Sequence, residues 1–172
     1  MAMKWLKKLT GAAPKKTSLK PKVPSVSSYL TPKRIIFFSS GPSKRQVIGS
    51  LIGALDLKDP SAALKAILSR EEMGSTIIAR GLVLPHARLE GLTKIEAAIG
   101  ICPTGVTDPH DGGHPIRVYV LFLGPADNMK EHLSFLASVS ALFQKEGFLD
   151  KLVKLASPEG VLHALRQVEK KA

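Results

Sequence analysis

The stretch from Val118 to Leu123 (VYVLFL) limits the folds that this chain can adopt. Its six successive residues are all apolar or aromatic. In an extended strand, neighbouring side chains point to opposite faces of the sheet, so this pattern predicts a strand that is buried on both faces. Such a strand needs a covering layer above and below it. We therefore expect a sheet with helices on both sides.

Patterns along the rest of the chain predict the other elements. The predicted strands lie at residues 34–39, 82–84 and 95–102. The predicted helices lie from residue 44 to about 55, and at about 60–72, 127–143, 146–155 and 158–170. This order lacks a strict βαβ alternation, and we expect an α/β fold in which a small mixed sheet forms the middle of a three-layer α/β/α sandwich. In the helix at 127–143, the residues expected to face the core are Met129, Leu133, Leu136 and Phe143.

Three helix starts carry capping signals. Ser43 and Gln46 have the spacing of a capping box, in which each side chain bonds the backbone N–H of the other residue. Asp59 precedes Pro60, which suits an N-cap followed by proline at the first helical position. Ser157 is the expected N-cap of the last helix. These signals fix where the helices begin.

The positive charge of the chain, +11 in total, is concentrated at its beginning. Residues 1–55 contain 11 Lys or Arg and no Asp or Glu, while the remaining 14 basic residues balance all 14 acidic ones. Residues 1–24 are rich in Lys, Pro and Ser and are predicted to be a disordered basic tail, with the domain at 25–172. The tail could touch an anionic membrane through Trp5, Leu6 and Leu9, although a solvated leader is favoured. A neutral body with few aromatics does not indicate nucleic-acid binding.

Several functional classes lack their sequence signals. No apolar run approaches the ~20 residues of a membrane helix, and the first residues lack the apolar core of a secretory signal. The single cysteine, Cys102, excludes an internal disulfide framework, so we expect a reduced, cytoplasmic setting. There is no P-loop, dinucleotide fingerprint or Gly-x-Ser-x-Gly, and no cofactor is expected.

His86 is the candidate reactive residue, in the stretch from Gly81 to Leu92 (GLVLPHARLEGL). Pro85 has a fixed φ and holds Leu84 extended, so the histidine follows a rigid neighbour. Neutral imidazole is a good nucleophile toward phosphorus, and Arg70 or Arg88 could stabilise phosphate oxygens. The alternative is a hydrogen-bonded histidine at a strand end without a chemical role. The residues alone favour that alternative.

The longer segment from Arg70 to Leu92 (REEMGSTIIARGLVLPHARLEGL) resembles the active-site signature of phosphotransferase-system enzyme IIA domains of the fructose/mannitol/nitrogen-regulatory type. The resemblance covers about residues 27–170, from the opening strand TPKRIIFF to the helix ASPEGVLHAL. It implies that His86 accepts a phosphoryl group from HPr or a nitrogen-branch analogue. The phosphate then passes to an enzyme IIB, or it serves as a regulatory state. The alternative is a regulatory binding module with a partner for its basic tail.

By position in the motif, the resemblance implies roles for further residues. Arg70 corresponds to the arginine that neutralises the phosphate, and His132 to a second histidine that donates an N–H to it. Each has a structural alternative, a helix-end cation for Arg70 and a histidine at the border of the core for His132. Phosphate or partner contacts are expected from Ser75, Thr76 and Arg88.

The sequence departs from the family pattern after the Ser-Thr turn, where glycines are common but residues 77–80 are Ile-Ile-Ala-Arg. The loop could therefore be stiffer or shaped differently at the surface where partners dock. An apolar rim around His86 is expected from Leu82, Leu84 and Leu92.

A second histidine group lies in the turn DPHDGGHP. His110, Asp111 and His114 could suggest a metal, but they lie in a Gly-Pro turn without a cysteine or a distant fourth ligand. We interpret the segment as an exposed polar turn and expect no metal site.

Overall fold

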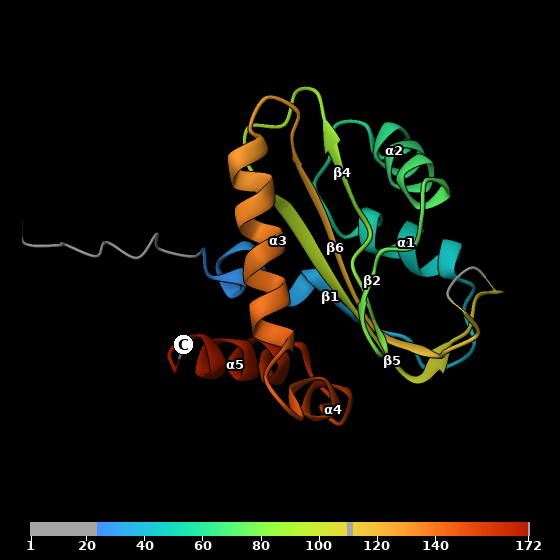
Figure 1. Ribbon diagram of the computed structural model, residues 1–172, viewed down its shortest axis with the longest axis vertical. Coiled ribbons are helices and arrows are strands. Elements are labelled where there is room, and N and C mark those ends of the chain that lie inside the picture. Colours follow the sequence, from blue (N-terminus) through green and yellow to red (C-terminus); the bar gives the residue numbers. More distant parts are fainter. Residues whose placement is uncertain (1–23, 110–111, 172) are drawn as a thin grey trace, which may run out of the picture.

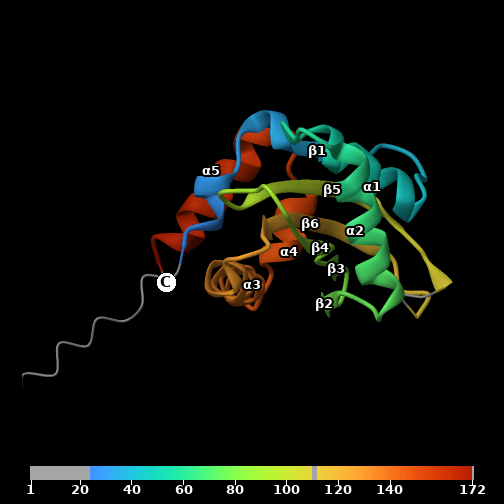
Figure 2. The same ribbon diagram turned by 90° about the horizontal axis from the view of Figure 1, so that it is seen from above.

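A computed structural model of the protein describes residues 24–109 and 112–171. Within this part of the chain, a mixed sheet lies between two layers of helices (Figure 1). Helices α1 and α2 cover one face, and α3, α4 and α5 cover the other, which Figure 2 shows from above. The three-layer α/β/α sandwich is therefore confirmed.

The elements follow one another in the order that the sequence patterns indicate. The strands are β1 (Ile35–Phe37), β2 (Ile77–Ala79), β3 (Leu82–Val83), β4 (His86–Leu89), β5 (Glu96–Val106) and β6 (Ile116–Pro125). The helices are α1 (Lys44–Gly53), α2 (Pro60–Glu72), α3 (Met129–Phe143), α4 (Phe148–Val153) and α5 (Pro158–Glu169), preceded by 3₁₀ turns η1 (Val26–Tyr29) and η2 (Pro32–Arg34).

Strand β6 is the centre of the sheet. It pairs antiparallel with β5 along one edge and parallel with β3 and β4 along the other, while β1 and β2 are the outer strands. Its residues from Val118 to Leu123 are all fully buried. Val118, Val120 and Phe122 join the core under α3 to α5, whereas Tyr119, Leu121 and Leu123 join the core under α1 and α2. The prediction of a strand buried on both faces is confirmed.

The capping signals are also confirmed. Ser43 and Gln46 form both bonds of a capping box at the start of α1. Asp59 caps α2 through the N–H of Ala62, and Ser157 caps α5 through the N–H of Gly160. Proline occupies the first position of both α2 and α5.

Two short strands were not predicted. Residues Ile77–Ala79 form β2 and pair antiparallel with β3, where the sequence analysis expected only a loop. Residues His86–Leu89 form β4, although the polar residues after Pro85 suggest a turn. Both segments lie near the edge of the sheet and are only partly buried, so neither has the apolar alternation of a core strand.

The predicted inward face of α3 is confirmed for Leu136 and Phe143, which pack in the core, but it is wrong for Met129 and Leu133. Met129 and Leu133 are 46% and 55% exposed, while His132, Phe135 and Val139 are buried. The buried stripe is displaced by one residue because the helix turns a histidine toward the sheet. A pattern that counts histidine as polar assigns the neighbouring apolar residues to the core instead.

Hydrogen bonds connect the first described residues to the last helix of the domain. The carboxylate of Glu169 in α5 accepts hydrogen bonds from the hydroxyls of Ser25 and Ser27, each at 2.6 Å, and from the N–H of Ser27. The predicted basic tail spans residues 1–24, of which residues 1–23 lie outside the described part of the chain, so its role stays a prediction. Among the described helices, none combines the length and apolar character of a membrane span.

Two substitutions on α3 test its corrected face. Phe135→Ala removes a fully buried ring that packs at a tilt against Phe122 and is expected to cost about 3–5 kcal/mol of unfolding free energy. Leu133→Ala is the matched control and is expected to change the stability by less than about 0.5 kcal/mol, because Leu133 is mostly exposed. Urea unfolding measures both, and equal losses would contradict this orientation of α3.

Candidate active site

His86 begins β4, directly after Pro85. Strands β3 and β4 pair with the same edge of β6, one before and one after Leu84 and Pro85. The pairings Val83 with Tyr119 and His86 with Phe122 keep the same register along β6, so Leu84 and Pro85 do not shift the edge. The N–H of Phe122 donates to the carbonyl of Pro85 at 3.1 Å. The ring of His86 stacks on that of Phe122, with centroids 5.4 Å apart and planes 11° apart. The strand pairing thus fixes both the backbone and the ring.

A hydrogen bond determines which nitrogen of His86 keeps its lone pair. Nδ1 lies 2.7 Å from the carbonyl oxygen of Leu84. Because a carbonyl can only accept, Nδ1 carries the proton and donates it. In the neutral ring, Nε2 therefore keeps its lone pair. The ring is half-buried, and this arrangement suits a nucleophile that another molecule must reach.

His132 lies beside both His86 and the ring of Phe122, and the three rings form a compact group. The two imidazole centroids are 5.4 Å apart, and the centroid of His132 is 4.8 Å from that of Phe122. His132 is 6% exposed, and its Nδ1 has no hydrogen-bond partner. A side chain at Gly124 would place its Cβ only 2.7 Å from this Nδ1. Glycine at position 124 therefore leaves the space that the imidazole occupies.

Both histidines are held in the neutral form. Burial lowers the pKa of His132 to about 4, and the positive charges that His86 and Arg88 can carry act in the same direction. Burial also lowers the pKa of His86, and Arg70 adds to this, while the hydrogen bond to Leu84 and the charge of Glu71 oppose it. At neutral pH the site therefore offers neutral imidazole nitrogens in a positive field.

Two arginines supply that field from different elements. Arg70, in the last turn of α2, donates from Nη1 to the carbonyl of Gly74 at 3.1 Å, and its charge acts on His86. Arg88 of β4 donates to the carbonyl of Ala126 at 3.0 Å, and its charge acts on His132. The structure thus brings the predicted residues Arg70, His132 and Arg88 to one place around His86.

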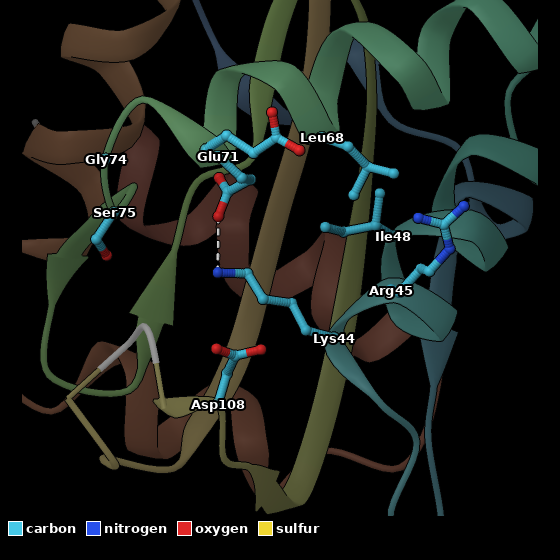
Figure 3. Close-up of a pocket in the computed structure, with 9 residues that line it drawn as sticks. Lys44, Arg45, Ile48, Leu68, Glu71, Gly74, Ser75 and Asp108 are labelled. Atoms are coloured by element: carbon cyan, nitrogen blue, oxygen red, sulfur yellow. Dashed lines mark ion pairs between the residues drawn. The ribbon is translucent and has the colours of Figure 1, made fainter.

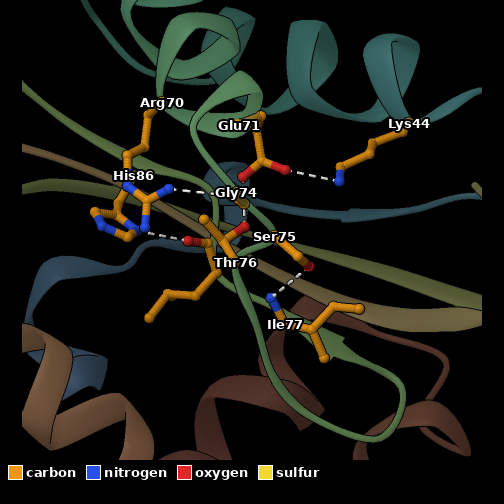
Figure 4. A network of polar contacts seen from close by, with 9 residues as sticks. Lys44, Arg70, Glu71, Gly74, Ser75, Thr76, Ile77 and His86 are labelled. Atoms are coloured by element: carbon orange, nitrogen blue, oxygen red, sulfur yellow. Dashed lines mark hydrogen bonds and ion pairs between the residues drawn. The ribbon is translucent and has the colours of Figure 1, made fainter. Parts of the chain in front are cut away.

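The Ser-Thr turn lies next to Arg70 (Figure 4). Ser75 is exposed, and its hydroxyl accepts the N–H of Ile77 at 3.3 Å. Thr76 is buried, and its hydroxyl donates to the carboxylate of Glu71. The Ser75 hydroxyl is thus on the surface, whereas that of Thr76 is directed to Glu71. Phosphate or partner contacts from these two residues stay a prediction.

Sequence reasoning missed Lys44 and Glu71, which pair at 2.7 Å next to this turn. Glu71 is adjacent to Arg70 and lies within the quoted motif, but motif position did not distinguish it from a solvated acid. Lys44 is 26 positions before Arg70, and nothing in the local sequence indicates a contact with α2. The capping box at Ser43 was the one available signal, since it locates Lys44 at the start of a helix.

The predicted apolar rim is wrong for Leu82 and Leu84, which are both fully buried in the core. Alternation along residues 82–84 turns the side chains of Leu82 and Leu84 toward α3 to α5. Leu92 is partly buried against the other core. The large apolar side chains that are exposed among the described residues are Met73, Ile78, Met129 and Leu133. Met73 follows Arg70 by one helical turn, and the last two flank His132 on α3.

Cys102 does not belong to this group of residues. Cys102 is buried in the core beneath α1 and α2, and burial raises its pKa to about 11, so it is an inert thiol at neutral pH. His110 and Asp111 lie outside the described residues. The interpretation of their turn as an exposed polar segment without metal therefore stays a prediction.

The sequence matches the family model of the "Phosphoenolpyruvate-dependent sugar phosphotransferase system, EIIA 2" over residues 28–168. The chain belongs to this family. A phosphocarrier or regulatory role follows from that membership, and the resemblance seen in the sequence is confirmed.

Relatives come from both the sugar and the nitrogen branches. The fructose-specific EIIA component of Haloferax volcanii is 27% identical over 82% of this chain and 95% of its own length. A nitrogen regulatory protein of Pseudomonas aeruginosa is 26% identical over 84% of this chain and 96% of its own. The fructose-specific EIIABC component of Bacillus subtilis is also 26% identical over 84% of this chain, but the match spans only 24% of that longer protein.

Solved structures share the fold. The nitrogen regulatory protein IIA-Ntr from Neisseria meningitidis superposes with a TM-score of 0.73 at 22% identity, over 81% of this chain and 98% of that one. Enzyme IIA for mannitol from Escherichia coli, determined in complex with phosphorylated enzyme IIB, gives a TM-score of 0.63 at 19% identity, over 80% and 97% of the two chains.

The low pKa of His132 predicts how stability depends on pH. Because the folded protein holds His132 neutral down to about pH 4, the unfolded chain binds more protons between about pH 6.5 and 4, and stability falls as pH falls. Between pH 7.5 and pH 5 this histidine is expected to remove about 2 kcal/mol. Urea unfolding at both pH values should show a smaller loss for His132→Gln. An equal loss in the two proteins would contradict the burial of a neutral His132.

Proposed function

We propose that the protein carries a phosphoryl group on Nε2 of His86. The observation that supports this most directly is the hydrogen bond from Nδ1 to the carbonyl of Leu84, which leaves the lone pair on Nε2. Nε2 attacks the phosphorus of a phosphohistidine on an HPr-type carrier. The new N–P bond forms as the N–P bond of the donor breaks, and the donor imidazole leaves with the electron pair.

Arg70 and His132 stabilise the phosphoryl group during this transfer. A loose transition state distributes negative charge over the three equatorial oxygens, so nearby positive charges and N–H donors lower its energy. Arg70 supplies a guanidinium whose charge already acts on His86. His132 supplies an imidazole 5.4 Å from that of His86, measured between the ring centroids. The unpartnered Nδ1 of His132 favours the tautomer that carries its proton on Nε2.

The phosphate then goes to an enzyme IIB, or it stays as a regulatory state. The mannitol enzyme IIA with the same fold forms a complex with phosphorylated enzyme IIB, which supports the first destination. The nitrogen regulatory proteins among the relatives support the second. Both destinations use the same chemistry at His86, so one experiment tests the step that they share.

Intact-protein mass spectrometry tests the phosphorylation. After incubation with phosphoenolpyruvate, enzyme I and HPr, the wild type is expected to gain the mass of one phosphate, and the gain should be labile in acid. His86→Ala should show no gain. His163→Ala, which removes an exposed histidine of α5, is the matched control and should react like the wild type. A persistent gain in His86→Ala, or no gain in the wild type, would contradict the proposal.

The exposed apolar residues of α3 are the proposed docking surface for the phosphate donor. Leu133→Asp is expected to raise the KM for phosphorylated HPr at least several-fold, because a charge there must lose its water when the surfaces meet. Ala141→Asp is the control, since it lies about 12 Å further along the same helix. A stopped-flow transfer assay measures both variants. An unchanged KM in Leu133→Asp would place the docking surface elsewhere.

A further inference from the structure

A buried ion pair joins the two helices on one side of the sheet. Nζ of Lys44 lies 2.7 Å from a carboxylate oxygen of Glu71, and the two side chains are only 12% and 11% exposed. Figure 3 shows Lys44 reaching from the start of α1 to the end of α2, along a cavity of about 510 Å³. Burying two charges removes much of their hydration, so the pair needs good geometry and further hydrogen bonds to be tolerated.

Both charges stand at helix ends that the helix dipole disfavours. Lys44 is the first residue of α1, where the free N–H groups carry partial positive charge. Glu71 is in the last turn of α2, where the free carbonyls carry partial negative charge. Neither residue therefore stabilises its own helix. The pair stabilises the contact between the start of α1 and the end of α2.

The carboxylate of Glu71 connects this contact to the reactive histidine. Its other oxygen accepts the hydroxyl proton of Thr76, which is 4% exposed. The carbonyl of Thr76 accepts the N–H of Leu84 at 3.0 Å, and the carbonyl of Leu84 accepts the Nδ1 proton of His86. Polar contacts thus lead without interruption from α1 to the ring that carries the proposed nucleophile (Figure 4).

The same contacts determine where Arg70 lies. Arg70 precedes Glu71 in α2 and donates to the carbonyl of Gly74. Gly74 has a φ of +146°, which other residues rarely adopt, and as a glycine it gives the turn no side-chain contact. The segment from Arg70 to Thr76 is therefore fixed at both ends by polar contacts, and the Glu71 carboxylate makes the contact that reaches another helix.

We propose that Lys44 is a positioning residue, which holds Arg70 and the Ser-Thr turn against His86 through Glu71 and Thr76. This inference rests on the proposed phosphoryl transfer at His86. Lys44 does not touch the reacting atoms. Its loss lets the end of α2 move relative to β4, and the guanidinium of Arg70 then no longer meets the phosphoryl oxygens correctly.

The first measurement uses a small phosphodonor, so that no protein partner is involved. In phosphoramidate the P–N bond breaks as Nε2 of His86 bonds to phosphorus, and ammonia leaves. Lys44→Met is expected to react more slowly than the wild type by on the order of 10- to 100-fold, the penalty of a small misplacement. Arg45→Met is the matched control, because Arg45 lines the same cavity but is exposed. Lys44→Arg should recover most of the rate.

A charge swap separates positioning from simple helix stability. The Lys44→Glu/Glu71→Lys double variant keeps an ion pair and puts each charge at its favourable helix end. Thr76 loses its carboxylate acceptor, and a cation replaces the anion near His86. We expect the swap to fold as stably as the wild type and still to react as slowly as Lys44→Met. An NMR titration of the unphosphorylated protein should show a lower pKa for His86 in the swap, because Glu71 raises it in the wild type.

The outcomes distinguish this inference from the proposed function. If the wild type gains no phosphate at His86, the proposed function fails, and the NMR titration still tests the connection to Glu71. If the wild type reacts and Lys44→Met reacts equally fast, the positioning role is wrong. If Lys44→Met does not fold, the swap decides: a rate like that of the wild type would overturn the inference, and a slow rate would support it.

Discussion

The residues of β6 from Val118 to Leu123 are buried, so water cannot satisfy their backbone N–H and carbonyl groups, and both edges of the strand must be paired. Strand β5 takes one edge, and β3 and β4 together take the other. Because the register continues across Pro85, the residue opposite Phe122 has no freedom to move along the strand. His86 is that residue, and its position follows from the demands of the central strand.

The electrostatics of the site agree with reversible transfer. A carrier must accept a phosphoryl group and also release it, so it cannot hold the dianion too tightly. Nearby positive charge favours the bound phosphate, and burial disfavours charge in general. Burial and the positive charge of Arg70 both lower the pKa of His86. The imidazole that is left when the phosphoryl group departs is therefore neutral. The charge of Glu71 opposes this effect, and its carboxylate sits close enough to moderate the field of Arg70.

The sequence predicted the layers and the capped helix starts, and the residues that it singled out around His86 lie close together, although their chemical roles stay predictions. A strand with apolar residues on both faces, capping residues and a long motif are local signals. They can be recognised from consecutive residues without knowledge of the fold. What could not be predicted depends on tertiary contacts. The buried face of α3 follows from a histidine facing the sheet, and β4 follows from pairing with a strand 36 positions later. The contact of Lys44 with Glu71 joins two helix ends, where neither charge suits its own helix.

The residues of the site come from both layers of helices that cover the sheet, and each layer contributes a different residue. His132 comes from α3, whose exposed residues Met129 and Leu133 face outward on the same helix. Arg70 comes from α2, on the opposite face of the sheet. The end of α2 is held to α1 by the ion pair between Lys44 and Glu71. The rigid strands lie between these two layers. The proposed docking surface on α3 and the proposed support of Arg70 by the ion pair therefore belong to opposite layers of the sheet, so substitutions in each layer can test docking affinity and phosphate stabilisation separately.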